Sequence, residues 1–131
     1  MSPSPLDKAA EVERDPARFG AWVENACLAF ACNAAQHVSY WREEPLEVDA
    51  VIDGTWGRWV LEVKTGGVEP ADLRGLLEFT RRWPEFRPLL VTDAAGLRLG
   101  ERTGVPAIHW RDFLWDGPEA RTTSAHFSPG E

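Results

Sequence analysis

Two short segments rich in valine and isoleucine, separated by a glycine-bearing connection, constrain the fold of this chain most strongly. The first covers residues 46–53 and the second residues 58–64. The connection at 54–57 reads Gly-Thr-Trp-Gly, and glycines of this kind supply the backbone conformations that a tight hairpin needs. The sequence therefore predicts two antiparallel strands joined by a β-hairpin.

The register of this hairpin places two acidic residues opposite each other. If Asp53 pairs with Arg58 around a four-residue loop, counting back pairs Asp49 with Glu62. Directly opposed residues have Cβ atoms about 4.5–5.5 Å apart, and two carboxylates at that separation repel each other unless a proton or a cation lies between them. A divalent metal ion is the usual reason to build such a pair.

Alternation along each strand decides which side chains share a face. Glu62 and Lys64 point the same way, and the register places Glu47 opposite Lys64. An alternative interpretation is a solvated face with an ion pair between Glu47 and Lys64, worth at most about 1 kcal/mol. On the first strand, alternate residues are expected to share a side, with Val48, Ala50 and Ile52 on one face and Glu47, Asp49 and Val51 on the other.

The lysine in this pattern is unusual for the chain. Of fourteen lysines and arginines, only Lys8 and Lys64 are lysines. A lysine kept beside two acids suggests a role for a compact point charge with an adjustable pKa, which a guanidinium cannot provide.

A helix is predicted to precede the strands, from an Asp15 N-cap with Pro16 at its first position to about Gln36. Its apolar residues follow the 3.6-residue helical spacing. Glu24 lies on a side of this helix formed by small and apolar residues, namely Gly20, Ala21, Cys27, Leu28 and Ala31. A carboxylate on such a surface requires a compensating partner, so Glu24 is a further candidate for the acidic site.

The remaining elements follow from periodicity and from proline and glycine positions. We predict strands at 37–42, 87–92 and 105–110, a helix from Pro70 to about Trp83, and a helical turn at 111–115. A strand meander followed by a helical crossover into another strand gives an α/β fold with a mixed central sheet flanked by helices.

Length and composition predict one domain at 15–116, with a polar lead at 1–14 and a disordered tail at 117–131. No apolar run approaches the 18 residues of a membrane span, and the first residues do not resemble a secretory signal. A cytoplasmic location without membrane association is the expectation. The two cysteines show no disulfide or zinc-binding pattern.

The net charge of −7 opposes simple affinity for nucleic acid, because phosphate binding needs local positive potential. Arg42, Arg74 and Arg81 could provide this positive potential. The preferred interpretation is an ordinary solvent-exposed helix face with an Arg74–Glu78 pair. Trp56, at the hairpin tip, is the tryptophan expected to be most exposed and could stack on a base.

The motif and its context resemble a known family. The acidic motif consists of Asp49, a gap of twelve residues, and then Glu62-Val63-Lys64. It is similar to the PD-(D/E)XK nuclease motif, with valine in place of the leading proline. Five segments occur in the order found in the C-terminal nuclease-like domain of prokaryotic AAA+ ATPases, namely 20–25, 40–42, 47–49, 61–64 and 89–92. The resemblance covers roughly residues 15–114.

This resemblance implies a restriction-endonuclease-like αβββαβ core and metal-assisted hydrolysis of nucleic acid, most simply DNA. Asp49, Glu62 and the Val63 carbonyl would bind Mg²⁺ or Mn²⁺, Glu24 would complete the acidic pocket directly or through water, and Lys64 would polarise the attacking water or contact the phosphate. An AAA+ ATPase domain or subunit is an expected partner, since the sequence itself contains no phosphate-binding G-x-x-x-x-G-K-[ST] loop. A homodimer is expected by analogy. The alternative is a catalytically silent module that serves as a binding or regulatory domain of an AAA+ system.

Overall fold

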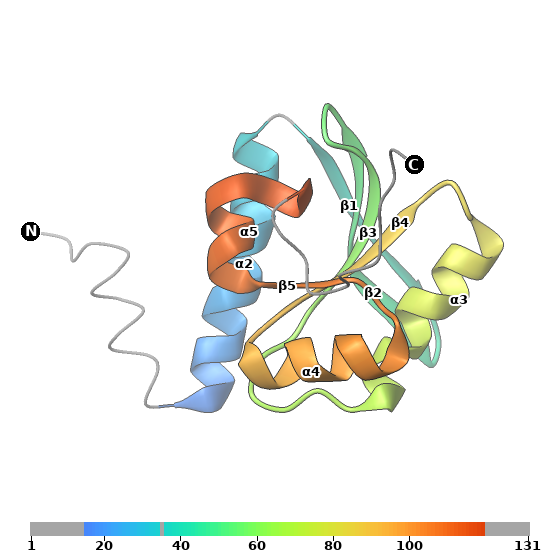
Figure 1. Ribbon diagram of the computed structural model, residues 1–131. Helices are drawn as coiled ribbons and strands as arrows, with labels where there is room; N and C mark the ends of the chain where they lie inside the picture. Colours follow the sequence, from blue (N-terminus) through green and yellow to red (C-terminus); the bar gives the residue numbers. More distant parts are fainter. Residues whose placement is uncertain (1–14, 35, 120–131) are drawn as a thin grey trace, which may run out of the picture.

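A five-stranded mixed sheet forms the centre of the molecule in a computed structural model that describes residues 15–34 and 36–119 (Figure 1). The strands lie in the order β1-β2-β3-β4-β5. Their bounds are β1 His37–Glu43, β2 Leu46–Gly54, β3 Gly57–Val63, β4 Arg87–Thr92 and β5 Ala107–His109. The first three strands are antiparallel neighbours, whereas β4 and β5 each run parallel to the strand before them. The predicted α/β fold with a mixed sheet is therefore confirmed.

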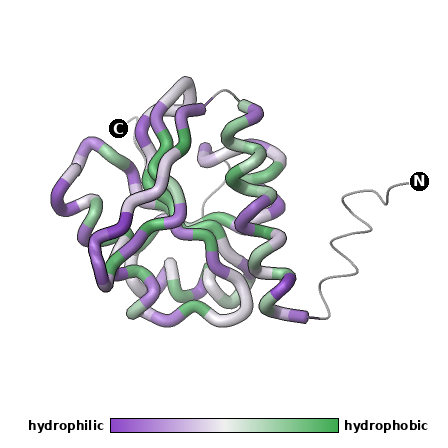
Figure 2. Tube along the Cα trace, turned by 180° about the vertical axis from the view of Figure 1, so that it is seen from behind, coloured by the Kyte–Doolittle hydropathy of each residue, from purple (hydrophilic) through white to green (hydrophobic). Residues whose placement is uncertain are grey.

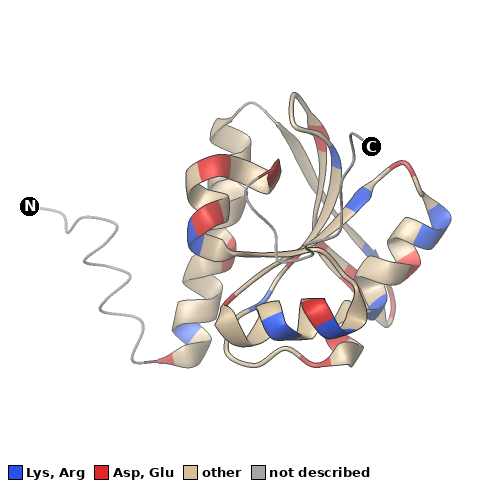
Figure 3. Cartoon of the chain, in the orientation of Figure 1, with Lys and Arg blue, Asp and Glu red and all other residues tan. Residues whose placement is uncertain are grey.

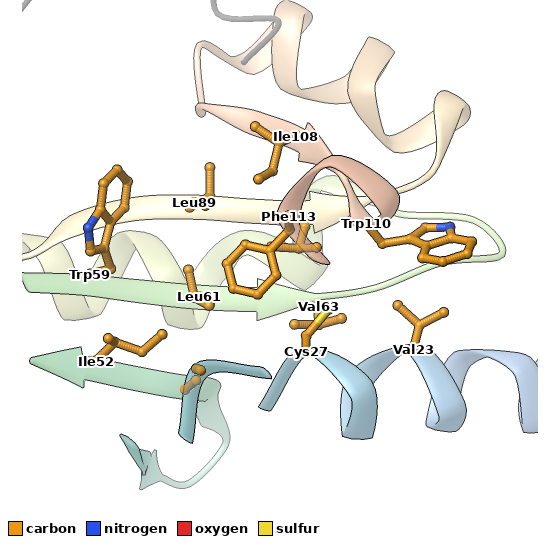
Figure 4. Packing of buried hydrophobic residues seen from close by; sticks show 13 residues of the cluster. Val23, Cys27, Ile52, Trp59, Leu61, Val63, Leu89, Ile108, Trp110 and Phe113 are labelled. Atoms are coloured by element: carbon orange, nitrogen blue, oxygen red, sulfur yellow. The ribbon is translucent and has the colours of Figure 1, made fainter. Parts of the chain in front are cut away.

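Helices cover both faces of this sheet. Helix α2 (Pro16–Asn33) and helix α5 (Trp110–Asp116) pack on one face, where their side chains meet those of β2, β3 and β4. Figure 4 shows Val23 and Cys27 of α2 pointing toward the sheet close to Val63. Helix α3 (Arg74–Arg82), preceded by the 3₁₀ turn η1 (Pro70–Leu73), and helix α4 (Ala94–Thr103) pack on the other face.

The first helix begins as the sequence predicts. The side chain of Asp15 accepts hydrogen bonds from the backbone N–H groups of Ala17 and Arg18, at 3.1 and 3.4 Å. Proline follows at a position where a missing N–H costs nothing. Hydrophobic and hydrophilic residues alternate along α2 (Figure 2), because one side faces the core and the other faces solvent. None of the described helices is both long and apolar enough to cross a membrane.

The hairpin between β2 and β3 has the predicted register with a tighter turn. Asp53 lies opposite Arg58, as predicted, but Gly54 and Gly57 also pair, so the loop consists of two residues rather than four. Gly57 has φ 97°, which favours glycine. The buried side chain of Gln36 secures the turn, since its Oε1 accepts from the N–H of Trp56 at 3.0 Å.

Trp56 is not the exposed residue that the sequence suggested. Its ring lies 5.5 Å from that of Phe30 and 6.0 Å from that of Phe113, as part of the core between α2 and α5. The large apolar side chains that are exposed include Tyr40 and Trp115 instead.

A β-bulge in β2 breaks the expected alternation. Ser39 pairs with Val51 and Trp41 pairs with Val48, so two steps along β1 match three steps along β2. The extra residue falls at Asp49 and Ala50. As a result Val48 packs with Val60 and α3, while Ala50 packs on the α2 side, and the prediction that Val48 shares a face with Ala50 was wrong. Bulges reorient side chains in this way and are frequent beside active sites.

Helix α4 is an element that the sequence analysis missed. Its two internal glycines disfavour a helix in isolation, but they allow close packing on the strands. A methyl group at Gly96 would stand 1.9 Å from Thr92 Oγ1, and one at Gly100 would stand 2.8 Å from the methyl carbon of Ala107. Asp93 at the N-cap and Gly104 in the left-handed conformation after the helix mark its ends.

The first three residues of the predicted tail form regular secondary structure. Residues Gly117–Glu119 form the 3₁₀ turn η2, in which Gly117 and Pro118 are buried, so these three residues belong to the domain. The predicted lead at 1–14 and the tail from 120 onward lie outside the described residues.

Candidate functional site

The bulge of β2 holds the carboxylate of Asp49 beside the end of β3. Asp49 is half-buried, and its Oδ2 accepts a hydrogen bond from the backbone N–H of Val63 at 2.8 Å. The pKa of Asp49 is raised to about 6, first by burial and then by the charges of Glu24 and Glu47, which together outweigh the opposing effects of the Val63 hydrogen bond and of Lys64. Asp49 therefore occupies an environment that disfavours its negative charge.

The surroundings of Glu62 disfavour its negative charge more strongly than those of Asp49 do. Its Oε1 is buried and has no hydrogen-bond partner among the described residues. Burial raises the pKa of Glu62 to about 9, and the negative charge of Asp49 is the next largest cause, followed by Glu47 and Asp72. A buried oxygen without a partner is costly, so this carboxyl group is suited to a proton or a cation.

Glu24, on helix α2, lies within electrostatic range of Asp49. Its negative charge contributes to the raised pKa of Asp49, and it adds to the effect of burial on Cys27, whose pKa is raised to about 12. Asp49 on β2 therefore feels the charge of Glu24 on α2 and in turn acts on Glu62 on β3, whereas Glu24 is not among the charges that act on Glu62.

Lys64 does not pair with Glu47. It follows the last residue of β3, and its backbone N–H continues the parallel ladder by donating to the carbonyl of Val91 at 2.9 Å. Its Nζ lies 3.1 Å from Oδ1 of Asp72, whereas Glu47 lies 3.8 Å from Arg42. The alternative Glu47–Lys64 pair is therefore wrong.

Asp72 is a site residue that the sequence analysis missed. It lies in η1, where its Oδ2 accepts from the N–H of Glu69 at 2.8 Å while its Oδ1 accepts from Lys64. Partial burial raises the pKa of Asp72, but these two hydrogen bonds and the charge of Lys64 outweigh it and lower the pKa below the ordinary value. The available signal was Glu69-Pro70-Ala71-Asp72, a helix-start pattern with an acid at the third helical position.

A cavity of about 210 Å³ opens beside these groups. Its polar lining consists of Glu47, Glu62, Lys64, Asp72 and Arg74. Asp49 and Glu24 do not line this cavity, whereas η1 and the start of α3 contribute Asp72, Arg74 and Gly75 to its wall. The helical arginines are concentrated on the α3 and α4 side of the sheet (Figure 3).

The arginine pairing on α3 differs from the expected Arg74–Glu78 pair. Glu78 accepts two hydrogen bonds from Arg81, at 2.8 and 2.6 Å, and one from Arg82 at 2.7 Å. These contacts use both oxygens of Glu78, and Arg74 lines the cavity instead.

Glycine at position 75 brings α3 against the bulged strand. A methyl group there would stand 2.1 Å from the carbonyl oxygen of Glu47. Gly75→Ala should therefore force α3 away from β2 and destabilise the domain by about 1–3 kcal/mol, measured by urea unfolding.

The matched control is Gly20→Ala on α2, where a methyl group would meet only Thr65 Oγ1 at 3.6 Å, an ordinary contact. This change should leave stability equal or raise it by up to about 1 kcal/mol, because alanine favours the helix. Equal unfolding midpoints for Gly75→Ala and the unsubstituted protein would contradict the close helix–strand contact.

Carboxylate oxygens are the ligands that a hard divalent cation such as Mg²⁺ prefers. Within 15–34 and 36–119, no group of three or more His, Cys, Asp and Glu side chains is arranged to hold a metal ion. Mg²⁺, however, keeps several waters and often takes only one or two carboxylates. Asp49 and Glu62 supply two, and the partnerless Oε1 of Glu62 has the character of a free ligand.

Comparison with known proteins adds a family without an assigned activity. Residues 19–112 match the model of a domain of unknown function, DUF4143. Searches of curated proteins and of solved structures each found no match. Domains of this family commonly occur alongside AAA ATPase domains. Because the match covers most of the length of the chain, the chain belongs to the DUF4143 domain family.

Proposed function

We propose that this domain is a metal-dependent nuclease that hydrolyses phosphodiester bonds of nucleic acid, with DNA as the expected substrate. One observation carries the proposal. The buried Oε1 of Glu62 has no hydrogen-bond partner among the described residues, and the nearby charge of Asp49 adds to burial in raising its pKa. Such a pair is costly to maintain for structure alone, and strongly raised pKa values are typical of functional sites.

Asp49, Glu62 and the backbone carbonyl of Val63 would hold Mg²⁺ or Mn²⁺, and Glu24 would assist directly or through a water molecule. Such an ion, when bound, lowers the pKa of a water ligand and offsets the charge that develops on the phosphate. It would also counter the net charge of −7, which otherwise opposes the approach of nucleic acid.

Lys64 would donate from Nζ to a phosphate oxygen or to the attacking water. Asp72 holds this ammonium group at the edge of the cavity through a 3.1 Å contact. Asp72 is in turn fixed by the N–H of Glu69, so the lysine is positioned before a substrate arrives. Preorganised charge of this kind is a major source of catalytic rate.

A second function has its own support. The domain could be a catalytically silent module that binds or regulates an AAA+ ATPase, because its family commonly occurs beside such domains. The lack of a three-ligand acidic group among the described residues also favours this function. The homodimer expected by analogy stays a prediction.

The test of the proposed function is cleavage of labelled single-stranded, duplex and branched DNA, and of RNA, with Mg²⁺ or Mn²⁺ and with EDTA as the blank. We expect metal-dependent cleavage of at least one substrate by the unsubstituted protein and none by Asp49→Asn. If every substrate stays intact in both metals, the nuclease proposal fails and the silent module is favoured.

A further inference from the structure

We infer that Arg74 binds a backbone phosphate of the nucleic acid at this site. The inference rests on the proposed function only in taking nucleic acid as the ligand, and it does not require that the ligand be cut. Arg74 is the first residue of α3 and lines the same 210 Å³ cavity as Glu62 and Lys64. A phosphate within reach of Lys64 would therefore enter the cavity that Arg74 borders.

Arg74 differs from the other cations around the cavity because it has no salt-bridge partner among the described residues. Lys64 is neutralised by Asp72. On α3, Arg81 and Arg82 are neutralised by Glu78. Arg74 is thus a basic group whose charge is available to an anion that occupies the cavity.

Local stability does not account for an arginine at this position. A positive charge in the first turn of a helix is disfavoured by the helix dipole, and α3 has no side-chain cap at its N-terminus. A phosphate would reverse this cost, since a guanidinium can donate two parallel hydrogen bonds to phosphate oxygens.

The backbone of Arg74 is held in place by its neighbour. Gly75 lies so close to the Glu47 carbonyl oxygen that a methyl group would stand 2.1 Å from it. This contact fixes the start of α3 against β2, and with it the base of the Arg74 side chain. The arginine therefore has a defined position relative to Glu62 on the adjacent strand.

Arg74 also stands between two cavities, which suits a polymer rather than a single small anion. A second cavity, of about 480 Å³, is lined by Arg74 together with Pro45, Leu46 and Leu77. Pro45, Leu46 and Arg74 border both cavities, and Leu77 is 50% exposed. A phosphate held by Arg74 would have room for a nucleotide on either side, with apolar surface available to one of them.

The test uses a fluorescently labelled single strand of about ten nucleotides, with Ca²⁺ as the divalent ion and a gel to verify that the strand remains intact. Arg74→Ala should weaken binding roughly tenfold to a hundredfold, the effect of losing a charge-assisted hydrogen bond. The slope of log affinity against log salt should fall by about 0.7, the value for one phosphate contact on a single strand. Arg74→Lys should restore part of the lost affinity and part of the lost salt dependence.

Arg98→Ala is the charge-matched control, because Arg98 is an exposed residue of α4 and lies outside both cavities. It should reduce affinity by less than about twofold, as expected for a distant surface charge. Equal losses for Arg74→Ala and Arg98→Ala would overturn the inference, as would the absence of measurable binding by the unsubstituted protein.

The two proposals can fail separately. Binding that depends on Arg74, without cleavage of any substrate, would refute the nuclease and leave the phosphate contact standing. Metal-dependent cleavage with unchanged binding by Arg74→Ala would refute the contact and leave the nuclease standing.

Discussion

Without divalent metal, the domain should become less stable as the pH rises from about 5 to 9. The pKa of Asp49 is raised from 3.8 to about 6, and that of Glu62 from 4.5 to about 9. The folded state therefore binds these protons more tightly than the unfolded chain does. Their contribution to stability is complete below the unfolded pKa values and is lost as the pH passes through about 6 and then about 9.

The expected loss is large because each unit of pKa difference corresponds to about 1.4 kcal/mol. Burial is the largest cause of the raised pKa of Glu62; the charges of Asp49, Glu47 and Asp72 also oppose its ionisation, and that of Lys64 favours it. We expect a fall of several kcal/mol in the free energy of unfolding, measured with urea in EDTA at pH 5, 7 and 9.

Glu62→Gln separates this effect from general pH sensitivity. The amide cannot ionise, so this variant should lose much less stability between pH 5 and 9 and should exceed the unsubstituted protein at pH 9. Glu101→Gln, at an exposed position of α4, should follow the unsubstituted protein. Parallel losses for all three proteins would show that Glu62 is not a proton-holding group.

The second large effect is expected at Lys64. Lys64→Ala should lower kcat for metal-dependent cleavage by about 10²–10³-fold, the usual cost of removing one preorganised donor to a developing charge. Lys64→Arg should be similarly impaired, because a planar guanidinium does not replace a compact ammonium group. Initial rates over a range of substrate and Mn²⁺ concentrations would separate kcat from KM and from metal affinity.

Loss of Lys64 should leave metal affinity unchanged or higher, because its positive charge opposes a cation near Asp49 and Glu62. A kcat for Lys64→Ala within threefold of the unsubstituted value would exclude the lysine from the chemical step. A fall in metal affinity that accounts for the whole loss would assign it an indirect role.

The hairpin and the first helix could be predicted from sequence because their signals are local. Asp15-Pro16 specifies a helix start, and Gly54 and Gly57 fix the turn that sets the register of β2 against β3. The ladder between β2 and β3 extends to Ala50 opposite Leu61, one residue short of the predicted pair of Asp49 and Glu62. The charge of Asp49 raises the pKa of Glu62, so the two acids interact, but their direct opposition stays a prediction.

The features that the sequence did not reveal depend on contacts between distant segments. The bulge at Asp49 depends on how β1 pairs with β2, and no residue type near it requires one. Helix α4 contains glycines that disfavour a helix until β4 and β5 are present to pack against them. Asp72 and Arg74 join the site only because the crossover from β3 to β4 carries η1 and α3 across the sheet.

The most direct test of a cation shared by Asp49 and Glu62 is calorimetric titration of the protein with Mn²⁺ at pH 8. The proposed site predicts one ion per chain for the unsubstituted protein and for Lys64→Ala, with binding lost in both Asp49→Asn and Glu62→Gln and weakened in Glu24→Gln. Absence of binding by the unsubstituted protein, or unchanged stoichiometry and affinity in Asp49→Asn, would contradict it.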